Sequence, residues 1–204
     1  MKIYHIMTGL LGVNSYFLVD ESTKEAVLID CGEYINKIEQ TEKKYGFTVK
    51  NVLLTHAHFD HSGCGKKLQQ KGAKIYISSI DAPKLYSGGT LSESLGKKFD
   101  DFKADYTFND GDVLTFSGIK IEVILTPGHT DGSCVFKVGD MLFTGDTLLY
   151  HSCGRVDFST GNKQQMINSL GKLFALKGDF KVYPGHHEFT TLDEERRFNP
   201  TRYL

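Results

Sequence analysis

Four potential metal ligands fall within six consecutive residues of the chain, inside the segment 55–61. They are His56, His58, Asp60 and His61. The apolar stretch 52–54 directly precedes the segment and has the length of a strand rather than of a buried helix. Imidazole nitrogens are good ligands for zinc and iron, and a carboxylate adds negative charge to such a site. Histidines packed this closely would repel one another when protonated, and a metal ion removes that cost. The segment therefore predicts a metal site.

Three further ligand candidates follow later apolar stretches, each directly after a glycine. His129 follows the stretch 119–125, Asp146 follows 141–144, and His186 follows 180–183. Glycine lets the backbone turn sharply where a strand ends. One such histidine alone would more often be an ordinary turn residue. The repetition of strand, glycine and then His or Asp favours a shared role in metal binding.

The elements that must position these residues alternate between strands and helices in the first third of the chain. We expect strands at 2–7, 15–19, 26–29, 52–54 and 75–77, with helices at 35–45, 62–71 and 79–87. The segment 55–61 is expected to be a loop. Segment 88–104 is rich in glycine and charge and poorly periodic, which fits either a flexible flap or a plain surface excursion.

The second half of the chain is dominated by strands. We expect them at 113–116, 119–125, 133–138, 141–144 and 180–183, with one helix at 162–176. No repeat or linker divides the sequence, so we expect a single domain over residues 1–204. Strands with helices in both halves predict an α/β fold of two sheets covered by helices.

Composition and charge exclude several classes of protein. The chain has 24 basic and 25 acidic residues, a formal charge of -1, whereas a nucleic-acid binder usually carries a basic excess. No apolar run approaches the roughly 18 to 20 residues needed to span a bilayer, and residues 1–5 lack the apolar region of a secretory signal. The four cysteines form no CxxC pair, so we expect reduced thiols and a cytoplasmic protein.

The order and separation of the motifs H-x-H-x-D-H, P-G-H-T, G-D and P-G-H resemble those of the metallo-β-lactamase superfamily. Within it, the chain is most similar to the glyoxalase II-like (hydroxyacylglutathione hydrolase-like) enzymes, in a short form. The resemblance implies a four-layered αββα sandwich with the metal site along one edge of the sheets. Full-length glyoxalase II continues into a helical domain that helps to hold glutathione, whereas this sequence ends at Leu204. A smaller thioester, another thiol carrier or a lactone therefore remains an alternative substrate.

The resemblance also implies how the ligands are shared between two divalent metal ions, expected to be Zn²⁺ although iron and manganese occur in close relatives. One ion would take His56, His58 and His129, the other would take Asp60, His61 and His186, and Asp146 would bridge both. A hydroxide bridging the ions would attack the carbonyl of a thioester such as S-lactoylglutathione. Asp60 would also orient that hydroxide. The implied enzyme is a binuclear metallohydrolase.

Three residues outside the ligand set are expected to contact the substrate or support a ligand. Arg155 resembles the basic residue with which glyoxalase II contacts glutathione, but a structural pair with Asp157 is an equal alternative. Asp30 is expected to orient a ligand histidine, and His187 either supports His186 or lies on the surface.

Two features receive structural interpretations. Cys64 is interpreted as a small buried thiol rather than as a ligand. The run 194–197, with two acidic and two basic residues, predicts a solvated helix face.

Two other enzyme classes of this superfamily compete with a hydrolase of thioesters. Persulfide dioxygenases share the fold and the H-x-H-x-D-H motif but hold one iron by two histidines and one aspartate. Nucleases of the superfamily usually carry an added domain and a basic surface, which this near-neutral chain lacks. The expected partner is therefore a small-molecule thioester, with neither nucleic acid nor membrane. The sequence gives no indication of oligomeric state.

Overall fold

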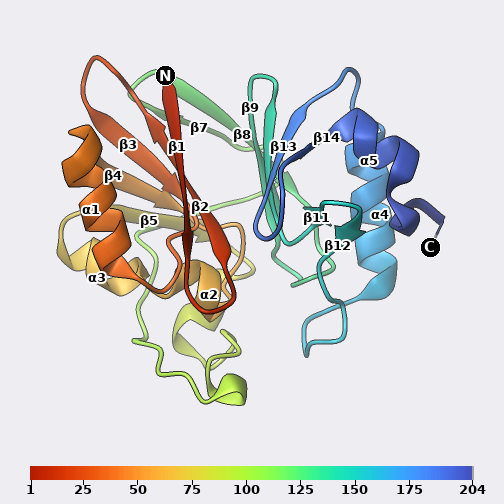
Figure 1. Ribbon diagram of the computed structural model, residues 1–204. Coiled ribbons are helices and arrows are strands. Elements are labelled where there is room, and N and C mark those ends of the chain that lie inside the picture. The colour runs from red at the N-terminus through yellow and green to blue at the C-terminus, as the bar shows by residue number, and fades with distance from the viewer. Residues whose placement is uncertain (204) are drawn as a thin grey trace. The chain divides into compact units, whose positions relative to one another are not determined.

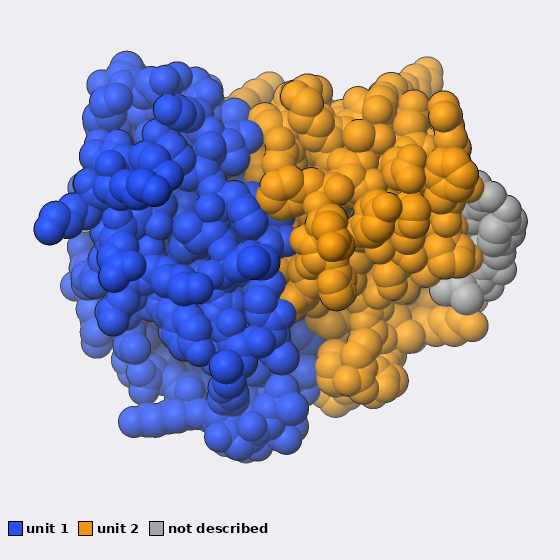
Figure 2. Space-filling view, in the orientation of Figure 1, with its two compact units in different colours: residues 1–108, 115–119 blue, residues 109–114, 120–204 orange. Residues whose placement is uncertain are grey.

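The computed structural model describes residues 1–203 and divides into two compact units. The first comprises residues 1–108 and 115–119, and the second comprises residues 109–114 and those from Lys120 onward (Figure 2). The chain forms two mixed six-stranded sheets and one small two-stranded sheet. The α/β class with two sheets is as expected from the sequence, and a single domain over residues 1–204 stays a prediction.

The sheet of the first unit has its strands in sequence order, from β1 at one edge to β6 at the other. β1 pairs antiparallel with β2, and β2 pairs antiparallel with β3. From β3 to β6 all neighbours are parallel, so their carboxyl ends meet at one edge. The strands are β1 (Lys2–Thr8), β2 (Val13–Val19), β3 (Glu25–Ile29), β4 (Thr48–Leu53), β5 (Lys74–Ser78) and β6 (Tyr106–Phe108).

Helices of the first unit cover one face of this sheet, as Figure 1 shows for α1 and α3. Ile38 of α1 and Leu68 of α3 pack in one buried cluster with Phe17, Leu28 and Val52 from three strands. Burying side chains of this size stabilises the fold by about 1.5–3 kcal/mol each. The helices are α1 (Ile35–Tyr45), α2 (Phe59–Ser62) and α3 (Gly65–Gln70), with 3-10 turns η1 (Ala82–Tyr86) and η2 (Glu93–Leu95).

The second six-stranded sheet has the order β14-β13-β10-β9-β8-β7. β10 and β13 are parallel, whereas β9 is antiparallel to both β8 and β10, so β8, β10 and β13 run in the same direction. Its strands are β7 (Val113–Phe116), β8 (Ile119–Leu125), β9 (Cys134–Val138), β10 (Met141–Gly145), β13 (Lys181–Pro184) and β14 (Thr190–Thr191). β11 (Leu148–Leu149) and β12 (Ser152–Cys153) form a separate hairpin.

Two helices, α4 (Lys163–Phe174) and α5 (Leu192–Phe198), belong to the second unit, and a 3-10 turn, η3 (Pro200–Tyr203), follows them (Figure 1). Each helix begins at a side chain that accepts a backbone N–H, Asn162 from Gln165 and Thr191 from Glu194. Apolar residues at helical spacing on α4 and one on α5 join strand residues in a single buried cluster. Its members include Met166, Leu170, Leu173, Leu192, Val135, Leu142 and Val182.

Two sequence predictions of local structure were wrong. The expected loop 55–61 ends at residue 58, because α2 begins at Phe59 and places Asp60 and His61 on a helix. Ser62 therefore ends α2 instead of starting a longer helix, and its hydroxyl donates to the His58 carbonyl oxygen at 2.9 Å. The segment 79–87 contains the 3-10 turn η1 rather than an α-helix.

Segment 88–104 is attached to the rest of the first unit along its length. The Phe59 N–H donates to the Thr90 carbonyl oxygen at 2.9 Å, and Lys66 Nζ donates to the Asp101 carbonyl oxygen at 2.9 Å. The Phe102 ring packs on Gly65, where an added Cβ would lie 2.3 Å from Cζ. Of the two interpretations of this segment, these contacts favour a packed surface excursion over a flap.

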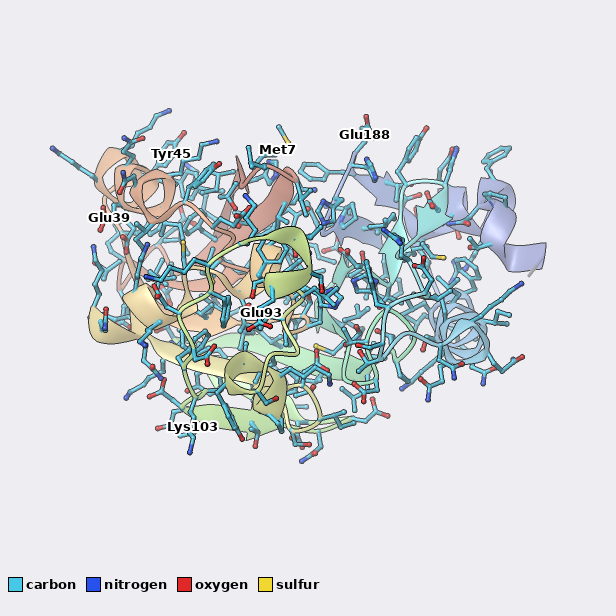
Figure 3. All side chains as sticks on the ribbon, turned by 90° about the horizontal axis from the view of Figure 1, so that it is seen from below. Met7, Glu39, Tyr45, Glu93, Lys103 and Glu188 are labelled. Atoms are coloured by element: carbon cyan, nitrogen blue, oxygen red, sulfur yellow. The ribbon has the colours of Figure 1, made fainter. Side chains whose placement is uncertain are left out.

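The outer surface bears some apolar side chains, such as Met7, which is 58% exposed at the end of β1 (Figure 3). Among residues 1–203, no helix is both long and apolar enough to cross a membrane. All four cysteines are thiols, as the sequence predicted.

Candidate metal centre

In the first unit, three functional segments follow the carboxyl ends of neighbouring parallel strands. Asp30 follows β3, His56 follows β4 after two residues, and Asp81 follows β5 after two residues. Side chains beyond the carboxyl ends of parallel strands converge at one edge, which is where α/β proteins commonly bind ligands. The predicted H-x-H-x-D-H segment lies at this edge because β4 ends directly before it.

The four ligand candidates of the first unit form one buried cluster. The His56 ring centroid lies 4.6 Å from that of His58 and 4.1 Å from that of His61. Asp60 Oδ2 lies 3.7 Å from His61 Nε2. His56 and His61 are fully buried, and His58 and Asp60 are only 4% and 7% exposed. The structure thus brings together all four residues predicted from the motif.

Asp30 organises two of these histidines through its buried carboxylate. Its Oδ2 accepts from His61 Nδ1 at 2.8 Å and from the Thr55 hydroxyl at 2.8 Å, and its Oδ1 accepts from the Thr55 N–H. Because the Thr55 hydroxyl donates to Asp30, its oxygen can accept from His56 Nδ1, which lies 3.1 Å away. With the protons on Nδ1, both rings present the Nε2 lone pair. Asp30 itself has φ +53°, a left-handed backbone that is uncommon outside glycine.

Asp81 also supports the motif, although no motif in the sequence includes it. It is fully buried; Oδ2 accepts the N–H of Ala57 at 2.9 Å and Oδ1 accepts from Lys84 Nζ at 2.7 Å. Ala57 is the residue between His56 and His58, so Asp81 fixes the backbone that carries both rings. The only sequence clue is its place after the strand 75–77.

The three ligand candidates of the second unit likewise follow strands that run in one direction. His129 follows β8, Asp146 follows β10 and His186 follows β13. Asp146 Oδ2 lies 3.5 Å from His129 Nε2 and 3.6 Å from His186 Nε2, so the carboxylate stands between the two rings. His129 and Asp146 are buried, and His186 is partly buried. The structure brings these three residues together as a second cluster.

Backbone groups hold His129 and Asp146 in place. His129 Nδ1 donates to the Arg155 carbonyl oxygen at 2.7 Å, which leaves Nε2 as the side facing Asp146. The Gly154 N–H donates to the Asp146 carbonyl oxygen at 3.0 Å. A Cβ on Gly154 would lie 2.0 Å from that oxygen and 2.9 Å from His129 Nδ1, so only glycine fits there.

The donor chemistry of both clusters fits a divalent metal ion. A ligating histidine commonly donates its other ring N–H to a carboxylate or a backbone carbonyl, which fixes the tautomer and makes the ligand more basic. His61 does so to Asp30, and His129 does so to a carbonyl. Buried imidazoles next to carboxylates suit zinc and iron.

Arg155 pairs with Asp157 on the surface of the second unit. Its Nε and Nη2 donate to the two carboxylate oxygens at 2.9 and 2.7 Å, and this pairing raises the pKa of the guanidinium. The guanidinium also stacks 4.6 Å from the Phe158 ring centroid. The Phe158 ring in turn stands edge-on to His129, 5.7 Å away. The structural pair is therefore present, and substrate contact stays a prediction.

The remaining predicted residues lie apart from the ligand chemistry. His187 is exposed with φ +66°, and its ring centroid lies 6.3 Å from that of His186. Burial raises the pKa of the Cys64 thiol to about 12 and the pKa of Cys31 well above its usual range. Burial also raises the pKa of Cys153. These thiols are protonated near neutral pH, which supports a packing role.

One expectation about the helix α5 was wrong. Glu195, in the run 194–197 expected to be solvated, is fully buried. Its carboxylate accepts hydrogen bonds from His151, Thr190 and Asn199. Charge runs predict solvation only on average, and here three hydrogen-bond donors replace water, of which His151 is distant in sequence.

Residues 8–186 match the Metallo-beta-lactamase superfamily. The chain belongs to this superfamily. It is 33% identical to hydroxyacylglutathione hydrolase GloC of Haemophilus influenzae over 192 residues, 90% of each chain. It is 36% identical to the human mitochondrial persulfide dioxygenase ETHE1, covering 91% of this chain and 70% of that protein.

A solved structure of TTHA1623 in a di-iron-bound form is similar to this chain throughout. The TM-score is 0.87 at 29% identity, with 98% of this chain and 100% of that chain covered. The fold is therefore the metallo-β-lactamase fold. The glyoxalase II-like resemblance inferred from the motifs is confirmed by the hydrolase and dioxygenase relatives.

Proposed function

We propose that this protein is a metal-dependent hydrolase that cleaves a thioester, such as a hydroxyacylglutathione. The observation that carries the proposal is a full set of ligand candidates, all buried except the partly buried His186, with the rings of His61 and His129 oriented by Asp30 and the Arg155 carbonyl. The whole-length similarity to GloC supports the thioester class. Glutathione is the first thiol carrier to test, with smaller thioesters and lactones as alternatives.

We assign the ligands to two divalent ions as the motifs imply. By this assignment His56, His58 and His129 would hold one ion, Asp60, His61 and His186 would hold the other, and Asp146 would be shared. Zinc is our first choice because imidazole and carboxylate suit it, with iron or manganese as alternatives. The di-iron form of TTHA1623 supports a two-metal site that accepts iron.

When bound, the metal pair would supply a water of lowered pKa as nucleophile and an electrophile for the carbonyl oxygen. Residues of this chain orient the water and the ligand rings. Asp60 accepts a hydrogen bond from the attacking water and orients it toward the carbonyl carbon. Asp30 keeps the His61 proton on Nδ1, so that Nε2 carries the lone pair that would bind the ion. No side-chain nucleophile is required, in accord with the protonated thiols.

Arg155 is proposed to bind a carboxylate of the substrate. Asp157 occupies two of the five guanidinium N–H groups, those on Nε and Nη2. The N–H groups on Nη1 can donate to a second carboxylate while Asp157 and the Phe158 ring hold the plane of the group. Glutathione carries two carboxylates, which suits this arrangement.

A persulfide dioxygenase is the second candidate, favoured by the 36% identity to ETHE1. Such an enzyme would use one iron and molecular oxygen on a glutathione persulfide. The same motif residues serve both activities, so the ligand set does not separate them. Measurements of metal content and oxygen consumption separate the two activities.

The proposed partners follow from the chemistry of the site. The substrate is a small molecule, and the near-zero net charge argues against nucleic acid or an anionic membrane surface. We further propose a cytoplasmic location, where glutathione thioesters are formed.

A turnover screen of the purified, metal-loaded protein tests the proposal. S-lactoylglutathione is compared with simpler thioesters, lactones and a β-lactam, while an oxygen electrode follows glutathione persulfide. Thioester hydrolysis without oxygen uptake supports the proposal. Oxygen uptake with persulfide and no thioester cleavage favours the second candidate instead.

A further inference from the structure

Glu195 on α5 is a fully buried carboxylate in the second unit that the proposed chemistry does not use. Its Oε1 accepts from the Thr190 hydroxyl at 2.8 Å. Its Oε2 accepts from the His151 N–H at 3.0 Å and from the Asn199 side-chain amide at 2.7 Å. A buried carboxylate is costly unless donors surround it, and here they come from β14, from the C-cap residue of α5 and from the distant residue His151. Glu195 is thus a fixed point between α5 and its neighbours.

The segment that Glu195 fixes is the tip of the β11–β12 hairpin, which Figure 1 labels. Leu149 pairs with Ser152 at the tip, and His151 adopts φ +48°, a conformation that non-glycine residues rarely hold without support. Asn199, itself fully buried, donates to the Ser152 carbonyl oxygen at 3.0 Å. Glu195 and Asn199 therefore hold two consecutive backbone groups of the tip.

The base of the same hairpin touches two proposed metal ligands. Asp146 begins it and is bonded through its carbonyl oxygen to the Gly154 N–H at 3.0 Å. The next residue, Arg155, accepts the His129 Nδ1 proton at 2.7 Å. Gly154 packs so tightly against Asp146 that a Cβ would not fit between them. A small displacement of Gly154 would therefore disturb its contact with Asp146. A shift of the hairpin backbone would move both contacts at once.

We propose that Glu195 is a positioning residue for the metal centre, acting through the β11–β12 hairpin on Asp146 and His129. By holding the tip of the hairpin, Glu195 keeps Gly154 in contact with Asp146. The Arg155 carbonyl oxygen then stays within hydrogen-bond distance of His129 Nδ1. The inference rests on the proposed metal centre, and it is independent of which substrate is cleaved.

Two substitutions in the full chain test the proposal with matched geometry. In Glu195→Gln, the side-chain oxygen still accepts from His151 and Asn199, while the amide N–H₂ turns to the Thr190 hydroxyl, which can accept. Glu195→Ala removes every contact. We expect zinc affinity, measured by competition with a chromophoric chelator, to fall roughly tenfold or more in Glu195→Ala, the usual effect of losing support behind a ligand. Glu195→Gln should stay close to wild type.

A second readout requires no metal. Hydrogen exchange of the Gly154 amide in the metal-free protein should accelerate in Glu195→Ala and stay slow in Glu195→Gln. His151→Ala is the control, because it removes the ring and its contact with Glu194 while keeping the N–H that Glu195 accepts. Its zinc affinity should match that of the wild type.

The proposal is overturned if folded Glu195→Ala keeps wild-type zinc affinity and Gly154 protection, or if Glu195→Gln loses as much as Glu195→Ala. Should Glu195→Ala fail to fold, Asn199→Ala decides, because it removes the donor to the Ser152 carbonyl; unchanged affinity and exchange there also overturn the proposal. Wild-type zinc binding without thioester turnover would reject the proposed substrate alone. Wild-type protein that binds no zinc would reject the metal centre, and the exchange data would still decide the link to Gly154.

Discussion

The carboxylate of Asp30 accepts a hydrogen bond from Nδ1 of His61 at 2.8 Å, with both side chains buried. The same oxygen accepts from Thr55, whose hydroxyl lies 3.1 Å from His56 Nδ1. One carboxylate at the end of β3 thus sets the tautomers of two histidines that follow β4. The fold therefore determines which ring nitrogen carries the proton in these two candidate ligands.

Replacing Asp30 with asparagine should weaken metal binding. An asparagine can keep the acceptor toward the Thr55 N–H only by presenting its N–H₂ to His61. That contact moves the His61 proton to Nε2, where it blocks ligation. We expect zinc affinity to fall about 10- to 100-fold, as measured by chelator competition. Asp140→Asn, at an exposed surface pair with Lys181, is the matched control and should change nothing. Equal affinities in the two variants would contradict the assigned role.

Replacing Asp81 with asparagine should destabilise the first unit. The change removes the counter-charge of Lys84, whose side chain is only 12% exposed, and weakens the bond to the Ala57 N–H. Breaking a buried ion pair costs about 3 kcal/mol, which urea unfolding would measure. Glu122→Gln breaks the exposed pair with Lys137 and should cost about 1 kcal/mol or less. Similar losses of unfolding free energy in the two variants would show that the buried Asp81 pair stabilises the fold no more than an exposed pair does.

Placing a methyl group at Gly154 should impair the second cluster. The added Cβ would lie 2.0 Å from the Asp146 carbonyl oxygen, so the backbone must shift away from Asp146 and His129. We expect Gly154→Ala to lose metal at the site that uses these two ligands, as metal analysis after gel filtration would detect. Gly171→Ala on α4, where nothing lies within 4 Å of the added Cβ, is the control and should retain full metal. Full metal content in Gly154→Ala would refute the packing argument.

Arg155→Ala should change substrate binding rather than chemistry. The guanidinium is exposed and lies outside the ligand set, so KM for S-lactoylglutathione should rise about tenfold while kcat changes little. A neutral thioester without a carboxylate should show no such change. Arg197→Ala, at an exposed position of α5, provides the control. An unchanged KM for the glutathione thioester would leave Arg155 with its structural pair alone.

The buried thiols should resist alkylation in the folded protein. Burial raises the pKa of Cys64 to about 12, so its reactive thiolate is scarce at pH 8. Iodoacetamide should modify Cys64 and Cys31 only after unfolding in urea, which mass spectrometry of peptides would establish. The pKa of Cys64 is raised in the folded state, so its buried, protonated thiol favours folding. This contribution to stability is complete below the ordinary thiol pKa and is lost as pH rises toward 12. Rapid modification of Cys64 in the native protein would contradict its burial.

The sequence was sufficient to find the ligand candidates because each one lies in the short segment that follows a strand. His129, Asp146 and His186 could be predicted from strand, glycine and ligand type, and the structure places each after the expected strand. Parallel strand ends converge, so a local pattern carries information about a site.

Long-range support was harder to predict. Asp81 meets Ala57 across 24 positions, and Glu195 meets His151 across 44 positions, with no local pattern to mark either contact. The helix α2 was missed because four residues are too few to show a helical period. The packing of Phe102 on Gly65 likewise depends on tertiary contact that composition does not reveal.

Metal dependence of the proposed hydrolase is tested by measuring metal content and S-lactoylglutathione hydrolysis together, before chelation, after chelation and after restoring zinc. We expect two ions per chain in the active protein, loss of turnover when they are removed and recovery when they are returned. Hydrolysis that persists without metal would contradict it, as would a single iron per chain accompanied by oxygen uptake on a persulfide and no thioester cleavage.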